Sequence, residues 1–305
     1  MATLKGQNFR VLVQDLSGAT PVFRCVAMST NCTITLTNNT ENATTKDVVS
    51  MAAAPTTTSK SWQAQVDSLD VSDMGALLTA IKSMATFTVA WDETDTDDNV
   101  STEGATFQRV GTAYLSDATF TFNDRENSAK NITFSGTGAI EHDTTIPFGD
   151  SAASSYTKGQ FVRLFLSSDN TNAPAKVVGA ARQLQWHVSV SLENATTKDT
   201  TGDWLIQEPT ELNYDISTTA LVRSNDTITS AVQAQGLSDL ETIYEGGTPV
   251  KWQVANTSGA NQRTKGSVIA SGSALLTQLT MNAPNRQSAD YTAQLVGFGI
   301  YTVGS

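Results

Sequence analysis

The sequence predicts a mainly β protein with two tandem domains, each a β-sandwich or partly closed barrel with one short helix and one long extended loop. Three observations lead to this prediction. The heptapeptide Glu-Asn-Ala-Thr-Thr-Lys-Asp occurs twice, at 41–47 and at 193–199, in a chain of 305 residues. Runs that alternate apolar and polar residues precede both copies, as in strands with one buried face. Charged residues make up only 16% of the chain and aromatic residues 7%, a composition typical of extended sheets with polar outer faces.

The repeat extends over nearly the whole chain. Three successive offsets align the two halves. An offset of 152 residues places 8–13 over 160–165 and Trp62 over Tyr214, and an offset of 163 places Leu77 over Leu240 and Trp91 over Trp252. An offset of 161 places Gly111 over Gly272, Arg125 over Arg286, Gly136 over Gly297 and Gly138 over Gly299. An insertion of 11 residues within 223–235 accounts for the first change of offset. We therefore expect a duplicated domain, with residues 1–145 as the first copy, 146–159 as a linker and 160–305 as the second copy. Each copy is long enough to bury a core.

The first copy opens with strands expected at 9–16, 22–27 and 32–36. The next 24 residues, 37–60, are polar, and a structureless loop of that length in a compact domain is unusual unless it has a function. Its counterpart in the second copy is 193–211. Two long loops at equivalent positions indicate arms that become ordered against a partner; the alternative is a pair of mobile solvent loops.

A short helix is expected at 72–82, because Met74, Leu77, Leu78 and Ile81 fall at i, i+3, i+4 and i+7, with Ser72 or Asp73 as the N-cap. Its counterpart at 237–244 has Ser238 and Glu241 in capping-box spacing and ends at a Gly-Gly pair. Strands at 62–69, 87–91, 111–122 and 132–136 complete the first copy, so each copy holds about seven or eight strands.

An acidic loop at 92–99 is the sharpest charge feature of the sequence. Asp95, Asp97 and Asn99 imitate the first ligands of an EF-hand, but Val100 stands where glycine is needed and Thr106 where the bidentate glutamate belongs. We therefore expect a solvated acidic turn and no bound metal.

The matching loop of the second copy is basic. Residues 1–150 hold 18 acidic and 9 basic residues, whereas 151–305 hold 12 and 10. The sequence suggests that the two loops face each other around an assembly with opposite charges. The residues of these charge-matched loops are Asp92, Asp95, Asp97 and Asp98 in the first copy and Arg263 and Lys265 in the second.

Catalysis and cofactor binding are not expected. The only histidines, His142 and His187, fall in the linker region and on the polar face of a strand, with no nucleophile or metal-ligand pattern around them. No phosphate-binding glycine loop and no basic stripe for nucleic acid is present. Cys25 and Cys32 flank a turn predicted at Met28-Ser29 and would then face each other across a hairpin; they are expected to be buried thiols. The absence of a signal sequence and of an 18-residue apolar run predicts a protein made in a cytoplasm, without a membrane span.

In their order, these features resemble the tail tube protein family of long-tailed bacteriophages, present in two fused copies. The matching features are the strand of 29–36, the Thr-Thr-Lys-Asp loop, the Ser61-Trp62 strand start, the Leu-rich helix, the strand of 111–115 and a closing strand that ends in Gly-x-Gly. The long loop reaches a neighbouring subunit or ring in that family. The resemblance therefore implies that the inter-subunit or stacking residues are Glu41, Thr44, Thr45, Lys46 and Asp47 in the first copy and Glu193, Thr196, Thr197, Lys198 and Asp199 in the second.

The resemblance further implies a structural subunit of a phage tail, found in the virion and assembled in the host bacterial cytoplasm. In the family that the chain resembles, the tubes are stacks of hexameric rings. Two tube domains in one chain therefore imply a trimer with pseudo-sixfold symmetry that stacks into a conduit for DNA ejection. Expected partners are further copies of the chain, a tape measure protein, a tail terminator and baseplate or tip proteins, while double-stranded DNA passes without specific binding. The alternative is a two-domain β-sandwich binding or adhesion module, which the missing export signal and the absence of an exposed aromatic cluster disfavour.

Overall fold

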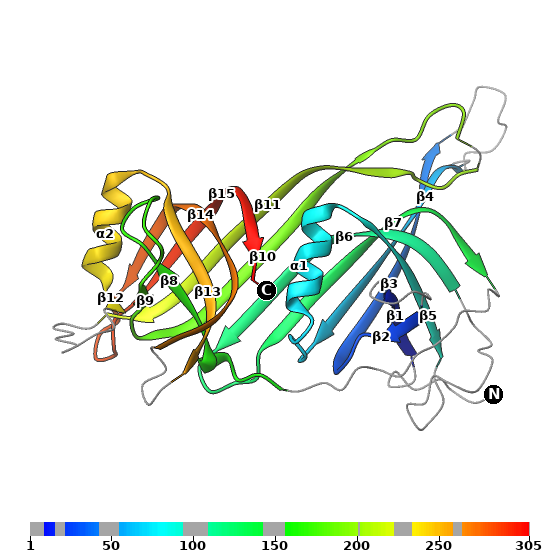
Figure 1. Ribbon diagram of the computed structural model, residues 1–305. Helices are drawn as coiled ribbons and strands as arrows, with labels where there is room; N and C mark the ends of the chain where they lie inside the picture. Colours follow the sequence, from blue (N-terminus) through cyan, green and yellow to red (C-terminus); the bar gives the residue numbers. More distant parts are fainter. Residues whose placement is uncertain are drawn as a thin grey trace.

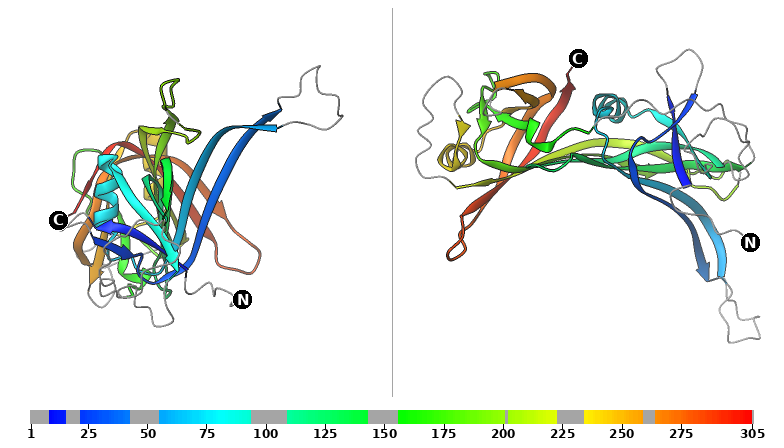
Figure 2. Two further views of the ribbon diagram at one scale, coloured as in Figure 1. Left: turned by 90° about the vertical axis from the view of Figure 1, so that its right-hand side faces the viewer. Right: turned by 90° about the horizontal axis from the view of Figure 1, so that it is seen from below.

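A computed structural model describes residues 9–15, 22–42, 55–93, 109–142, 156–200, 202–222, 234–258 and 264–304. Its strands form one 15-stranded sheet, and two α-helices, α1 (Met74–Ser83) and α2 (Leu237–Gly246), lie on the same side of it (Figures 1 and 2). The prediction of a mainly β protein is confirmed. The described strands run through both halves of the chain as a single open sheet and do not close into a barrel.

The first half contributes seven strands. They are β1 (Phe9–Asp15), β2 (Val22–Cys25), β3 (Ser29–Asn42), β4 (Pro55–Ser68), β5 (Thr86–Glu93), β6 (Arg109–Asn123) and β7 (Ala129–His142). Neighbouring strands pair antiparallel in the order β2-β1-β5-β6-β7-β4-β3. Strand β3 therefore lies at the edge of this half of the sheet.

The second half repeats this order. After the short 3-10 helix η2 (Gly159–Phe161), its strands are β8 (Val162–Leu166), β9 (Lys176–Val178), β10 (Ala181–Asn194), β11 (Gln207–Leu221), β12 (Ala234–Gln235), β13 (Val250–Ser258), β14 (Thr264–Asn282) and β15 (Asp290–Val303). Seven of them pair antiparallel in the order β9-β8-β13-β14-β15-β11-β10, and β12 adds parallel to β9. By position in this order, β10 corresponds to β3 and β14 to β6.

Positive φ angles recur at the same offsets as the sequence repeat. Four pairs of residues show them: Met28 and Ala180 (50° and 53°), Met84 and Gly247 (51° and 57°), Arg125 and Arg286 (64° and 62°), and Gly138 and Gly299 (80° and 75°). A positive φ is uncommon for non-glycine residues and marks a defined turn. The backbone therefore makes the same turns at matching places in both halves.

Both helices bury an apolar stripe, but their N-termini differ from expectation. The stripe of α1 consists of Met74, Leu77, Leu78 and Ile81, as predicted. The side chain of Asp73 makes no capping hydrogen bond and instead pairs with the buried ammonium of Lys130. In α2 the Asp239 carboxylate accepts a 3.1 Å hydrogen bond from the backbone N–H of Gly236, the N-cap residue. The predicted capping box of Ser238 and Glu241 is therefore wrong by two residues.

Most of the buried apolar side chains of the two halves belong to one contiguous core. Trp186 lies at its centre, with its ring 5.3 Å from that of Trp252, 5.6 Å from that of Tyr301 and 6.2 Å from that of Phe120 in the first half. Because a tryptophan buries a large apolar area, these contacts tie the two halves together.

The two cysteines do not face each other. Cys25 pairs with Leu12 across β2 and β1, and Cys32 pairs with Val66 across β3 and β4, so the expected hairpin between them is not formed. Both thiols are of intermediate burial and form no disulfide, and desolvation raises the pKa of Cys32. Among the described residues, no helix is long and apolar enough to cross a membrane.

Candidate inter-subunit surface

The two halves meet where an edge strand of the second half joins the sheet of the first. Strand β10 pairs antiparallel with β6, from Gln183 opposite Asn123 to Ser189 opposite Asp117. On the side that faces the helices, β10 presents Leu184, Trp186 and Val188, and all three are buried. Helix α1 of the first half lies against β10 and β15 of the second. We call this contact between β10 and β6 the internal joint.

A histidine clamp holds the opposite, polar side of the internal joint. The Nε2 atom of His187 lies 2.6 Å from Asp117 Oδ2 on β6, and its Nδ1 atom lies 2.7 Å from Asp215 Oδ1 on β11. These hydrogen bonds, first to Asp117 and then to Asp215, raise the pKa of His187 from 6.5 to about 10. The imidazolium therefore donates both N–H groups at neutral pH and links the two halves.

The loop between β10 and β11 crosses onto the first half (Figure 1). The Lys60 N–H donates to Asp203 O at 2.6 Å, the Leu205 N–H donates to Lys60 O at 2.8 Å, and the Gly138 N–H donates to Leu205 O at 2.8 Å. The ammonium of Lys60 also lies 3.3 Å from Asp203 Oδ2. Residues 202–206 thus dock as a short strand-like segment against β4 and β7.

The repeated heptapeptide of the second half shapes this loop and does not itself dock. The Thr196 N–H donates to Asn194 Oδ1, Thr196 Oγ1 accepts from the Ile206 N–H, and the Asp199 N–H donates to Thr197 Oγ1. The side chains of the predicted residues are exposed, namely Glu193, Thr196, Thr197, Lys198 and Asp199. Sequence reasoning missed the docking residues Asp203 and Leu205, although the Thr-Gly-Asp-Trp extension that only the second copy carries was a usable signal.

The corresponding arm of the first half projects away from the sheet (Figure 2). Strands β3 and β4 form this arm, and Glu41 lies exposed on β3 opposite Thr56. Thr44, Thr45, Lys46 and Asp47 lie outside the described residues. Their role as contact residues stays a prediction.

The charge-matched loops are described only in part. The backbone of Asp92 pairs with Arg10 at the end of β5, whereas Asp95, Asp97, Asp98 and Arg263 lie outside the described residues. The Lys265 ammonium donates to Pro174 O at 2.9 Å and to Gln253 Oε1 at 3.0 Å. One of the two predicted cations is thus hydrogen-bonded within its own half.

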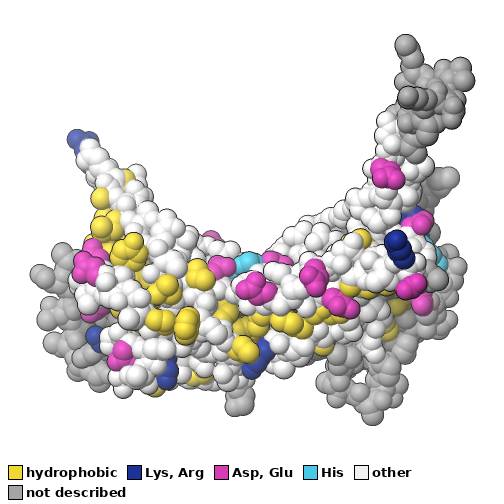
Figure 3. All heavy atoms as spheres, turned by 90° about the horizontal axis from the view of Figure 1, so that it is seen from above, with side chains coloured by type: hydrophobic (Ala, Val, Ile, Leu, Met, Phe, Trp, Pro, Cys, Tyr) yellow, Lys and Arg dark blue, Asp and Glu magenta, His cyan; other side chains and the backbone are white. Residues whose placement is uncertain are grey.

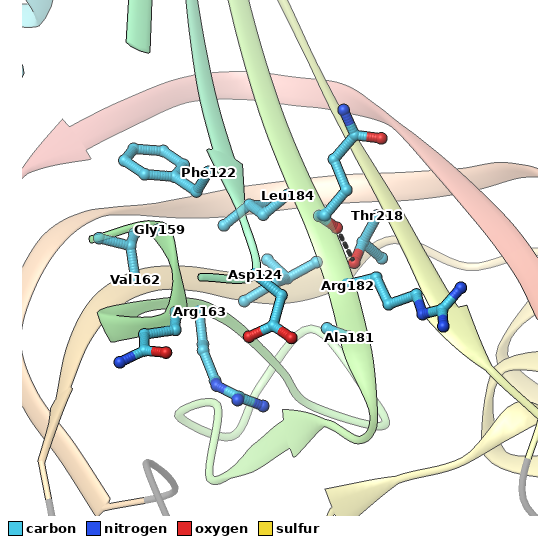
Figure 4. A pocket seen from close by; sticks show the side chains of 12 residues that line it. Phe122, Asp124, Gly159, Val162, Arg163, Ala181, Arg182, Leu184 and Thr218 are labelled. Atoms are coloured by element: carbon cyan, nitrogen blue, oxygen red, sulfur yellow. Dashed lines mark hydrogen bonds between the residues drawn. The ribbon is translucent and has the colours of Figure 1, made fainter. Parts of the chain in front are cut away.

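A small pocket lies at the end of the internal joint where Gln183 pairs with Asn123 (Figure 4). Residues from β6, β8, β10 and the segment around Gly159 line it, and Thr218 Oγ1 donates to Gln183 O beside it at 3.0 Å. A Cβ at Gly159 would lie 2.3 Å from Asn123 O, so the chain passes the joint too closely for any other residue. The pocket holds about 20 Å³, roughly the space of one water molecule, and is a packing gap of the joint.

The sheet face away from the helices is polar and carries acids but few cations. On β4, β6, β7, β10 and β11 around the joint, every second side chain points to this face. Around the joint, this face is formed by the odd-numbered residues of 61–67, 117–123, 131–137, 183–191 and 211–219. These described residues include the acids Asp67, Asp117, Glu211 and Asp215 and no Lys or Arg. His187 carries the one positive charge among them.

Large apolar side chains are exposed mainly on the second half. They include Met281, Val296, Phe298, Ile300 and Tyr244, and the first half adds Leu36. A view from above shows apolar side chains gathered over the second half and acidic ones along the middle (Figure 3). Exposed apolar patches of this kind mark contact surfaces in soluble assemblies.

The fold is an open sheet in which the two halves of the chain join side to side through β10 and β6. Residues 158–303 match the family model of the phage tail tube protein. The resemblance seen in the sequence is thus confirmed for the second half, over residues 158–303. The comparison with curated proteins gives no match.

Three solved structures show a partial likeness. A chain from the tail of an empty gene transfer agent particle with C6 symmetry has 14% identity and a TM-score of 0.35, over 48% of this chain and 95% of that chain. A chain from the virion of a native gene transfer agent particle has 14% identity and a TM-score of 0.36, over 49% and 99%. The SPP1 tail tube has 16% identity and a TM-score of 0.37, over 48% and 78%.

Proposed function

We propose that the protein is a structural, non-enzymatic subunit of a phage tail tube and that each chain supplies two tube domains, residues 1–145 and 160–305, joined by 146–159. The family match of 158–303 supports a tube domain in the second half. The same strand order and the same four positive-φ positions support one in the first half. The internal joint is the observation that carries the proposal, because it is a head-to-tail contact between two such domains.

A head-to-tail contact that repeats builds either a closed ring or an open filament. In the resembled family the ring has six domains, so three chains of two domains fill it. The proposed assembly is a trimer with pseudo-sixfold symmetry, stacked into a tube. Its further partners are a tape measure protein, a tail terminator and baseplate or tip proteins, and assembly takes place in the host bacterial cytoplasm.

The polar sheet face is the proposed wall of the conduit for DNA ejection. Lys and Arg that neutralise phosphates give a sequence-independent affinity, which would hold a passing duplex in place. The described strands around the joint carry acids and no Lys or Arg on that face, and the whole chain has a net charge of −11. A wall of this composition lets double-stranded DNA pass without specific binding.

The two loops of opposite sign are proposed to alternate around the ring. The acidic loop with Asp92, Asp95, Asp97 and Asp98 would then face the basic loop with Arg263 and Lys265. Exposed ion pairs contribute only about 0–1 kcal/mol each, so the effect is on which domains meet. If Asp95→Lys, Asp97→Lys and Asp98→Lys together leave ring formation unchanged at low ionic strength, the loops have no such role.

The ring itself is tested by native mass measurement and by averaged electron-microscope images of the purified chain at high concentration. Three chains per ring, with six similar lobes in cross-section, are expected. Six chains per ring, or a chain that stays monomeric under all conditions of concentration and salt, would contradict the proposal.

A further inference from the structure

We infer that strand β3 of one chain pairs antiparallel with strand β14 of the next chain, in a register that places Thr35 opposite Thr280. This inference rests on the proposed ring and specifies its contact between chains. We call it the external joint.

The register follows from the internal joint. Strand β3 corresponds to β10 at an offset of 152, and the free part of β14 corresponds to β6 at an offset of 161, since Leu115 pairs with Phe134 as Leu276 pairs with Leu295. The internal joint pairs Gln183 with Asn123 through Ser189 with Asp117. Subtracting 152 from the residue numbers of β10 and adding 161 to those of β6 gives seven pairs between β3 and β14. They are Asn31 with Pro284, Cys32 with Ala283, Thr33 with Asn282, Ile34 with Met281, Thr35 with Thr280, Leu36 with Leu279 and Thr37 with Gln278.

Both strands have a free edge for this pairing. Within the described part of the chain, β3 pairs only with β4. Strand β14 pairs with β13 as far as Ala274, and among the strands that the structure describes, β15 alone pairs with its residues 275–282. An unpaired strand edge is a template for another strand, and these two edges are the counterparts of edges that are already joined inside the chain.

Apolar side chains that are half-buried or exposed on the two edges are the counterparts of side chains that the internal joint buries. Cys32, Ile34 and Leu36 correspond to Leu184, Trp186 and Val188, which are 3%, 0% and 0% exposed, whereas Leu36 is 60% exposed. On the other strand, Met281 is 58% exposed and corresponds to Phe120 at 0%. Pairing of the two edges would therefore bury the apolar side chains of both.

Helix α2 supplies a third match. Its Tyr244 corresponds to Ile81 of α1, and Ile81 is buried at 1% while Tyr244 is 50% exposed. Since α1 covers β10 at the internal joint, α2 would cover β3 of the next chain at the external joint. Tyr244 then lies in the contact and not in solvent.

The polar sides of the two joints differ. The positions of His187, Asp117 and Asp215 are taken by Thr35, Gln278 and Gln63. The internal joint is thus held by an ionic clamp, while the external joint is built from neutral side chains. Contact between chains would then respond less to salt and pH than the joint within a chain.

A single cysteine tests the register. Cys32 is native and is expected opposite Ala283, and directly opposed strand residues have Cα atoms about 4.5–5.5 Å apart, within the range that a disulfide spans. In a Cys25→Ser background, Ala283→Cys is expected to shift the chain to covalent dimers and trimers on a non-reducing gel after mild oxidation of assembled rings. The matched control is Asn282→Cys, whose side chain faces the other side of the sheet and is expected to leave the chain monomeric on the gel.

The outcomes separate this inference from the proposed ring. Rings that assemble from Ala283→Cys without the crosslink, or that crosslink equally through Asn282→Cys, overturn the register and leave the ring standing. Absence of rings from the unmodified chain overturns the ring and the register together. A second pair, Ile34→Cys with Met281→Cys in a background without Cys25 and Cys32, is expected to give the same ladder of crosslinked chains, and its failure in assembled rings would also count against the register.

Substitutions that disrupt the external joint provide a second, independent test, with ring formation as the measurement. Leu36→Asp and Met281→Asp each place a charge in the proposed contact, and both are expected to keep a folded monomer by circular dichroism while rings are lost. Gln294→Asp is the matched control, because this side chain is exposed but lies on the opposite face of the sheet. Rings from Leu36→Asp and Met281→Asp as abundant as those from Gln294→Asp would contradict the inference.

Discussion

Tyr301 donates a 2.7 Å hydrogen bond from its hydroxyl to the backbone carbonyl oxygen of Leu78. The two residues are 223 positions apart, one on the last strand of the chain and the other in the helix of the first half. Both side chains are fully buried. The end of the chain is thereby fixed against α1, directly over the internal joint.

Tyr301→Phe removes this hydrogen bond and leaves the aromatic packing in place. We expect the free energy of unfolding to fall by about 1–3 kcal/mol, because the Leu78 carbonyl stays buried without this donor. Chemical denaturation followed by circular dichroism measures the change. Tyr156→Phe, at an exposed tyrosine, is the matched control and is expected to behave like the unmodified chain; equal stability of all three chains would show that the bond contributes nothing.

The histidine clamp makes stability depend on pH. A group whose pKa is raised on folding stabilises the protein fully below its unfolded pKa, and this contribution is lost as the pH rises through the folded pKa. For His187 the window runs from about pH 6.5 to about 10. We expect the free energy of unfolding to decline over this window more steeply in the unmodified chain than in His187→Gln.

The control for this prediction is the other histidine. His142→Gln removes an exposed imidazole at the end of β7 and is expected to keep the pH dependence of the unmodified chain. Denaturation midpoints at pH 6 and pH 9 for the three chains provide the comparison. Parallel pH profiles for His187→Gln and the unmodified chain would mean that the clamp does not hold a proton.

The buried Lys130 depends on Asp73. Its side chain is 0% exposed, while that of Asp73 is 45% exposed and lies at the start of α1. Removing one partner leaves a buried charge uncompensated, which costs up to about 3–5 kcal/mol, and replacing the pair by apolar groups is often neutral. We therefore expect Asp73→Asn to destabilise the chain and the added Lys130→Met to restore most of the loss.

The second half supports this expectation, since Gly236 and Tyr291 occupy the positions that match Asp73 and Lys130. A double-mutant cycle of unfolding free energies measures the coupling. Additive effects of the two substitutions would show that the ion pair is not the reason for the loss.

The arm of the first half is expected to act only in assembly. Deleting residues 43–49 should leave a chain with an unchanged thermal transition that no longer forms tubes, because the ordering entropy of the arm is offset only by contact with a neighbour. Circular dichroism measures folding, and electron microscopy measures assembly. Tubes of normal length from the deleted chain would show that the arm is an ordinary loop.

Sequence patterns of short range were sufficient for most elements. The expected loops at 37–60 and 193–211 are wrong at their ends, because β3 continues to Asn42, β4 begins at Pro55 and β11 begins at Gln207. The helix at 74–83 follows from the spacing of four apolar residues, and the strands follow from alternation, because both signals repeat within a few positions along the chain. Residues that the repeat offsets align make equivalent close contacts between a glycine and an aromatic ring. A Cβ at Gly136 would lie 2.1 Å from the Trp62 ring, and one at Gly297 would lie 2.5 Å from the Tyr214 ring.

The sequence by itself determined what is periodic or repeated: strands, helices, the two matching halves and the polar face. Only the tertiary structure decided that β10, the edge strand of the second half, also pairs with β6 of the first half, which brings His187 beside Asp117, 70 residues away. It also decided that residues 202–206 dock against β4 and β7 of the same chain. Register between distant strands depends on which edges are free and what covers them, and no local pattern in the chain carries that information.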